Sequence, residues 1–63
     1  MGVNTYRTFQ TLAFNDGYKM FIHSVNGNNV DAVLYTPDNA DYVEYEDVDF
    51  SVIDSIKRFH NRS

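Results

Sequence analysis

The chain has 63 residues and a net charge of −4, and its 43% hydrophobic and 22% charged residues argue against disorder, collagen-like structure and coiled coil. It contains no cysteine, which excludes a disulfide, a thiolate zinc site and a cysteine nucleophile. Because a chain this short supports one hydrophobic core at most, residues 1–63 are expected to form a single small domain.

The first predicted element is a β-hairpin around Asn15-Asp16-Gly17, which separates two segments rich in aromatic, β-branched and Thr residues. Glycine in third place suits a three-residue loop that ends in a left-handed residue. With this loop Leu12 faces Met20 and Gln10 faces Ile22, and the apolar residues of both strands gather on one face of the sheet.

A second turn is predicted at residues 26–29, so that strands at about residues 5–14, 18–25 and 30–36 form an antiparallel meander. Pairing across this turn sets Ile22 against Val33, and it leaves the opposite face apolar as well. Two apolar faces imply that both are covered, one by a helix and the other by a second subunit or a partner. A one-residue error in the register of one strand is the alternative explanation. The residues assigned to this second face are Phe9, Phe21, His23, Val25, Val30, Ala32 and Leu34.

The segment between Tyr35 and Val48 permits two interpretations. Thr36-Pro37 is compatible with a helical turn, since proline is tolerated at the first helical position. Residues 41–46 alternate acidic and apolar side chains, which suits a short edge strand protected from aggregation by its charges. We favour a turn followed by a short edge strand over a helix.

A C-terminal amphipathic helix is predicted with Asp49 as its N-cap, and Ser51 with Asp54 forms an alternative cap. Asp54 and Arg58, one turn apart, are expected to pair. A helix this short must dock to be stable, so the fold class is α+β: a small antiparallel sheet, a three-strand meander with a possible fourth edge strand, and one helix on one face. The apolar positions of the helix are Val52, Ile53, Ile56 and Phe59.

No pattern in the chain predicts catalysis, a metal site or a cofactor site, so we expect a protein that is not an enzyme. His23 and His60 are the only imidazoles, and neither has a second histidine at the short spacing of zinc sites. We expect His23 to be partly buried in the sheet and His60 to act as a cation at the helix C-terminus. Ser24 adjoins His23, but neighbours on a strand point to opposite faces and cannot share a proton.

The charge pattern carries the functional prediction. Residues 38–49 contain six acids and no Lys or Arg, whereas Lys57, Arg58 and Arg62 lie within the last seven residues. Such an acidic block repels phosphate and attracts cationic protein surfaces. We name the predicted partner-binding residues the acidic strip: Asp38, Asp41, Tyr42, Glu44, Tyr45, Glu46, Asp47 and Asp49.

The sequence therefore predicts a small, acidic, non-enzymatic interaction module that binds a basic surface of a partner protein through the acidic strip. In a sharper version, the strip imitates nucleic-acid phosphate and inhibits a DNA- or RNA-binding protein, in the manner of small phage or mobile-element inhibitors. The alternative without a binding function is an acidic surface that serves only to keep the protein soluble.

Two further hypotheses belong to other classes. The first is a structural homo-oligomer, with a dimer favoured and no dedicated ligand. The second is a sheet that stacks single-stranded nucleic acid on Tyr6, Tyr18, Tyr35 and Phe14, which is disfavoured because the chain lacks a cationic track. No apolar run approaches the ~20 residues that span a bilayer, and the N-terminus lacks a signal-peptide pattern, so a cytoplasmic protein without membrane contact is expected.

Overall fold

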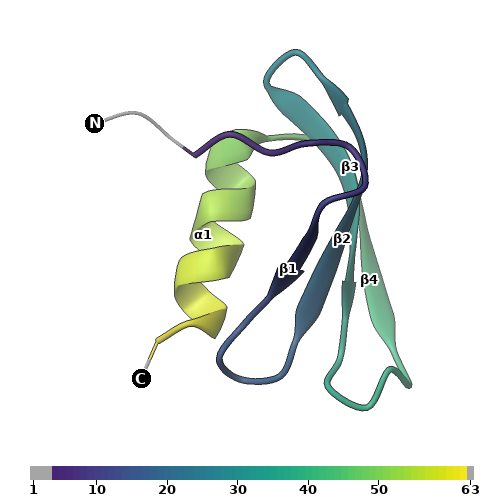
Figure 1. Cartoon of the computed structure of the whole chain (residues 1–63), viewed down its shortest axis with the longest axis vertical. Coiled ribbons are helices and arrows are strands. Elements are labelled where there is room, and N and C mark those ends of the chain that lie inside the picture. The colour runs from purple at the N-terminus through teal and green to yellow at the C-terminus, as the bar shows by residue number, and fades with distance from the viewer. Residues whose placement is uncertain (1–3, 63) are drawn as a thin grey trace.

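The computed structural model describes residues 4–62 as a four-stranded antiparallel sheet followed by one helix. The sheet has the spatial order β1-β2-β3-β4, and the helix α1 lies on one of its faces while the other face is open (Figure 1). This arrangement confirms the predicted α+β meander with a fourth edge strand. The bounds are β1 Thr11–Ala13, β2 Lys19–Asn26, β3 Asn29–Tyr35, β4 Tyr42–Asp49 and α1 Phe50–His60.

The β1–β2 hairpin has the predicted three-residue loop. Leu12 pairs with Met20, and the Gly17 N–H donates to the Phe14 carbonyl at 3.1 Å. Gly17 has a φ of 93°, and a Cβ at this position would lie 3.1 Å from the Cβ of Pro37. Both the left-handed conformation and the close approach of the β3–β4 turn therefore favour glycine here.

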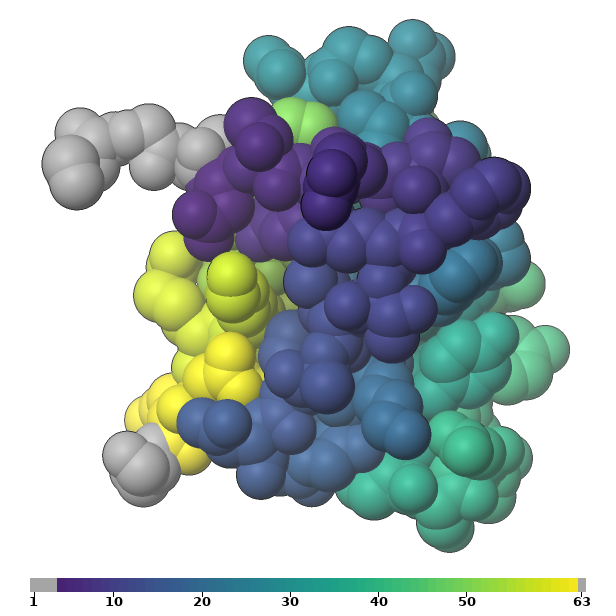
Figure 2. Space-filling view, in the orientation of Figure 1, coloured from purple at the N-terminus to yellow at the C-terminus, as the bar shows by residue number. Residues whose placement is uncertain are grey.

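The first strand is shorter than predicted, because β1 begins only at Thr11. Residues 4–8 instead cross one end of the molecule from α1 to the sheet (Figure 2), and the chain turns at Phe9, whose φ is 67°. Phe9 and Gln10 still form backbone hydrogen bonds with Ile22 of β2, at 2.7 and 2.8 Å. Tyr6 attaches this segment to the helix, because its buried ring packs edge-on against Phe50 of α1 at a centroid distance of 5.5 Å. The sequence pattern assigned Tyr6 to a sheet strand, but its ring packs against the helix.

A β-bulge at His23 corrects the predicted register of β2 and β3. Val25 pairs with Val30 as predicted, but beyond the bulge Ile22 pairs with Ala32 and not with Val33. The one-residue register error considered above therefore explains much of the second apolar face. The face under α1 carries most of the core, which consists of Tyr6, Phe14, Met20, Ile22, Val30, Ala32, Leu34, Phe50 and Ile53.

The segment after β3 is a turn and then a strand, as favoured from the sequence. The Asn39 N–H donates to the Thr36 carbonyl at 2.9 Å, which closes the turn. β4 then pairs with β3 along its length, with a second bulge where Asp47 adopts a φ of 53°. Bulges and charged side chains are two devices that keep an edge strand from pairing with another chain.

The helix begins at the predicted cap, since the Val52 N–H donates to Asp49 Oδ1 at 3.2 Å. The predicted ion pair between Asp54 and Arg58 is wrong. Asp54 points inward, is only 8% exposed, and accepts hydrogen bonds from Asn4 and Tyr6. Arg58 donates instead to the Ser55 hydroxyl at 3.2 Å. Within residues 4–62 no helix has the length and apolarity needed to cross a bilayer.

The C-terminal end of α1 is fixed to the β1–β2 loop through His60. Its Nδ1 lies 2.6 Å from Oδ2 of Asp16, and its ring stacks on Phe14 at 5.4 Å and contacts Tyr18 at 4.4 Å. Desolvation opposes ionisation of Asp16, but the hydrogen bonds from His60 and the Tyr18 N–H outweigh it and hold the pKa of Asp16 below its usual value. His60 therefore anchors the end of α1 to the hairpin loop, a contact that the sequence did not predict.

Candidate functional site

The candidate binding surface is the face of the sheet that points away from α1 (Figure 1). Because side chains alternate along a strand, the residues between the core positions project from this side. Val33 marks its centre: it is 8% exposed, yet it lies outside the core cluster. We call this surface the open face and define it as Phe9, Thr11, Lys19, Phe21, His23, Val33, Tyr35, Tyr42 and Glu44.

Aromatic rings concentrate on the open face. Phe9 is 72% exposed and Tyr42 is 62% exposed. Phe9 stacks on Phe21 at 6.2 Å, the edge of Phe21 meets His23 at 4.9 Å, and Tyr35 lies 6.3 Å from Tyr42 on the neighbouring strand. A contiguous exposed patch of this kind is a recognised mark of an interaction surface, and aromatic residues are frequent binding hot spots.

Two shallow hollows lie side by side on the open face. The larger, of about 420 Å³, is lined by Lys19, Phe21, His23 and Tyr35 among others. The smaller, of about 150 Å³, lies between β3 and β4 and shares His23 with the first. Three carboxylates border this second hollow, so an aromatic depression adjoins an acidic one. They belong to Asp31, Glu44 and Glu46.

The acids of the acidic strip divide into two groups. Within residues 4–62 the carboxylates of Asp41, Glu44 and Glu46 take part in no side-chain hydrogen bond or ion pair. All three are exposed, and they follow one another along β4 and the turn before it. Their charges are therefore available to an external partner. We call these three residues the β4 carboxylates.

The remaining acids of the strip hold local structure. Asp38 accepts from the Thr36 hydroxyl at 2.7 Å and from the Ala40 N–H at 3.1 Å, and these bonds lower the pKa of Asp38. Asp49 caps α1, where the Ser51 hydroxyl and the Val52 N–H lower its pKa in the same way. Hydrogen bonding favours the charged form of each carboxyl, which explains both shifts.

The two tyrosines of the strip lie on opposite sides of β4. Tyr42 belongs to the open face, whereas Tyr45 is half-buried and packs against the core beneath α1. Tyr42 is therefore the ring of the strip that is presented together with the β4 carboxylates. Because side chains alternate along a strand, two residues that are three positions apart lie on opposite faces.

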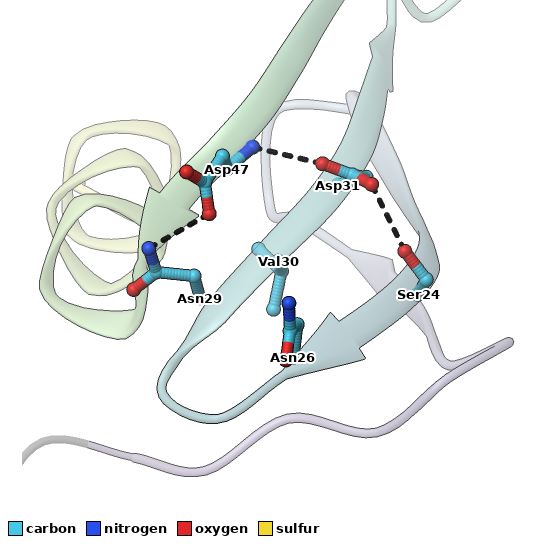
Figure 3. A pocket seen from close by; sticks show the side chains of 6 residues that line it. All are labelled: Ser24, Asn26, Asn29, Val30, Asp31 and Asp47. Carbon is cyan, nitrogen blue, oxygen red and sulfur yellow. Dashed lines mark hydrogen bonds between the residues drawn. The ribbon is translucent and has the colours of Figure 1, made fainter.

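Asp47 belongs to a polar cradle at the end of the β2–β3 hairpin (Figure 3). Asp31 accepts from the Ser24 hydroxyl at 3.0 Å and from the Asp47 N–H at 2.8 Å, and Asp47 accepts from the Asn29 amide at 2.8 Å. These bonds join three strands and fix the bulge of β4. In the described part of the chain no group of three or more His, Asp or Glu side chains is placed to hold a metal ion.

Sequence reasoning predicted a second apolar face and placed Phe9, Phe21 and His23 on it, but it misplaced the register of β3 and so assigned Val33 and Tyr35 to the core face. Tyr6, Tyr18 and Phe14, which were expected to share a stacking face with Tyr35, pack on the covered side instead. His23 was expected to be partly buried but is exposed at the bulge. An extra residue in a strand leaves no local sequence mark, so only the excess of apolar residues on both faces hinted at the error.

No protein-family model matches this chain, and neither a curated protein nor a solved structure shows significant similarity to it. Its function is therefore inferred from the chemistry of the open face and the β4 carboxylates.

Proposed function

We propose that the protein is a non-enzymatic interaction module whose open face, with the β4 carboxylates, binds a partner protein surface that is apolar at its centre and basic at its rim. The observation that carries this proposal is the exposure of Phe9 and Tyr42, 72% and 62%, on one face of the sheet, together with three carboxylates that form no hydrogen bond or ion pair within residues 4–62. Aromatic anchors supply most of the affinity in such an interface, and rim charges supply orientation and association rate.

The charge of the surface selects the class of partner. Lys19 is the single Lys or Arg assigned to the open face, and the three β4 carboxylates outweigh it. Such a surface repels the phosphates of nucleic acid, whose binding depends on several cations in a track. It attracts lysine and arginine side chains, whose aliphatic stems can cover the rings while their charged ends meet the carboxylates.

The proposal predicts that removing two β4 carboxylates weakens partner binding without loss of stability. Glu44→Gln with Glu46→Gln is expected to lower affinity about tenfold, which is about 1.4 kcal/mol, and to reduce its dependence on salt. A partner is first captured from lysate on the immobilised protein and identified, and it is then titrated with each variant by calorimetry at two ionic strengths.

The matched control is Asp38→Asn with Asp49→Asn, which removes the same charge from residues that hold the turn and the helix cap. Asparagine caps a helix about as well as aspartate, so this variant is expected to fold. It should bind the captured partner almost as tightly as the unaltered protein. Equal affinity in all three proteins would show that the β4 carboxylates do not contact the partner and would refute the proposal.

A further inference from the structure

The solvent side of α1 is the second unpartnered surface of the molecule. Val52 is 37% exposed and Phe59 is 63% exposed, and the Arg62 guanidinium lies 5.9 Å from the centre of the Phe59 ring. Val52 and Phe59, seven positions apart, lie on the same side of α1, and Arg62 lies just beyond the end of the helix, over the ring of Phe59. We call this surface the helix stripe and define it as Val52, Ser55, Arg58, Phe59 and Arg62.

The helix stripe has the opposite charge to the open face. It contains two arginines and no acid, and the single acid within α1, Asp54, is buried on the inner side of the helix. An exposed ring, Phe59, lies among these cations. The helix stripe therefore presents an apolar ring between two cations at the C-terminal end of α1, and this combination matches the aromatic rings and carboxylates of the open face.

We propose that a second copy of this chain is a partner of the open face, bound through its helix stripe. This inference rests on the proposed function, because it uses the same open face and β4 carboxylates. In the contact, Phe59 of one copy packs among the rings around Tyr42 and Phe21 of the next. Arg58 and Arg62 then meet Glu44 and Glu46, and guanidinium groups stack on exposed tyrosine rings.

The position of the two surfaces determines the form of the assembly. The open face and α1 lie on opposite sides of the sheet (Figure 1), so one copy offers both surfaces at once. A contact between two different surfaces is heterologous, and it continues from copy to copy until a ring closes or a filament grows. A two-fold dimer does not result from this contact.

Charge also argues against the simplest alternative, in which two open faces pair with each other. That arrangement would bring the β4 carboxylates of both copies into one interface, opposed only by Lys19 of each copy. Juxtaposed like charges are costly in a desolvated interface. The helix stripe supplies two arginines to the same carboxylates, so the head-to-tail contact is the better match.

Two variants, each with one surface removed, test this arrangement. The first, Tyr42→Ser with Glu44→Gln and Glu46→Gln, lacks the open face but keeps the helix stripe. The second, Arg58→Gln with Phe59→Ser and Arg62→Gln, lacks the helix stripe but keeps the open face. All six positions are exposed, so both variants are expected to fold, and thermal unfolding of each one verifies this before mixing.

Sedimentation of the purified proteins gives the outcome. The unaltered protein is expected to exceed the mass of a dimer as concentration rises, with association weakened at least about tenfold between ~0.05 and ~0.5 M NaCl. Each variant alone should remain a monomer, whereas an equimolar mixture should form a one-to-one heterodimer and nothing larger. The intact stripe of the first variant then occupies the intact open face of the second.

Three results would overturn the inference. Dimers of the second variant alone would indicate pairing of open faces, and dimers of the first variant alone would indicate pairing of helix stripes. A mixture that remains monomeric, with an unaltered protein that is also monomeric, would exclude self-association. In that last case the proposed function is judged separately, by whether Glu44→Gln with Glu46→Gln still weakens binding of the partner captured from lysate.

Discussion

Replacing Asp54 by Ala is expected to lower the free energy of unfolding by about 3 kcal/mol, because it removes a buried carboxylate that several donors share. The Tyr6 hydroxyl donates to Oδ1 of Asp54, the Asn4 N–H donates to Oδ2 at 3.1 Å, and the Asn4 side-chain amide donates to Oδ1 at 3.2 Å. Without Asp54 the buried Tyr6 hydroxyl loses its acceptor, and the N-terminal segment loses its attachment to α1.

The same cluster predicts how stability depends on pH. Burial alone would raise the pKa of Asp54, but the hydrogen bonds from Tyr6 and Asn4 outweigh it and hold the pKa below the usual value. The unfolded chain therefore binds a proton at higher pH than the folded one. The stabilisation is present above the ordinary carboxyl pKa of about 3.9 and is lost as the pH falls through the lower, folded value.

Tyr6 sets the upper end of the pH range in which this cluster stabilises the fold. Burial, and then the bond to the Asp54 carboxylate, raises the pKa of Tyr6 from 10.0 to about 12. The folded protein keeps the phenol protonated while the unfolded chain ionises, so this contribution is complete below pH 10 and is lost as the pH rises towards 12. The cluster is expected to stabilise the fold most between these acid and alkaline limits.

Urea unfolding of three variants across this pH range tests the cluster. Tyr6→Phe should lose part of the stability and the alkaline dependence, since it removes the phenol and leaves Asp54 with the Asn4 donors. Asp41→Ala is the matched control: it removes an exposed carboxylate that forms no hydrogen bond or ion pair within residues 4–62 and keeps the backbone bonds of Asp41 to Thr36, so it should change stability by less than about 0.5 kcal/mol. If Asp54→Ala costs no more than Asp41→Ala, the buried cluster does not stabilise the fold as described.

The parts of the fold that sequence could predict are set by a few adjacent residues. The hairpin loop needs a left-handed residue, and Gly17 supplies it in the position that fixes the pairing of Leu12 with Met20. The helix needs an acceptor at its start, and Asp49 supplies it. Such features are local, so their chemistry can be read from neighbouring residues in the chain.

The parts that sequence could not predict depend on contacts between distant residues. Asp54 has an equally suitable local partner in Arg58, and only the packing of the N-terminal segment decides that it bonds Tyr6, which is 48 residues away. Among the acids of the strip, Asp47 accepts from Asn29, 18 positions away, a contact that only folding creates, whereas the bonds of Asp38 with Thr36 and of Asp49 with Val52 are local. A run of acidic residues in the sequence shows that the segment is negatively charged, but it does not show which carboxylates remain free to bind a partner.

Deleting His23 is expected to leave the fold intact, whereas deleting Phe21, two positions earlier, is expected to abolish it. Without His23, Ile22 still opposes Ala32 and Ser24 still opposes Asp31, so the two strands form a regular ladder and every other side chain keeps its face. The loss is limited to the edge contact between His23 and Phe21 on the open face, and we expect it to cost about 1 kcal/mol.

Deleting Phe21 removes a residue from the regular ladder, and the bulge can absorb the change only by moving side chains to the wrong faces. His23 would then oppose Ala32 on the covered face, and Ile22, which is 0% exposed, would move to the open face. Exposing one large aliphatic side chain and burying an imidazole without a partner together cost about 4 kcal/mol or more. That approaches the whole stability of a small domain, about 5 kcal/mol.

Circular dichroism and amide NMR spectra of the two deletions distinguish these outcomes, and a folded protein without Phe21 would show that the bulge does not determine which side chains the sheet buries.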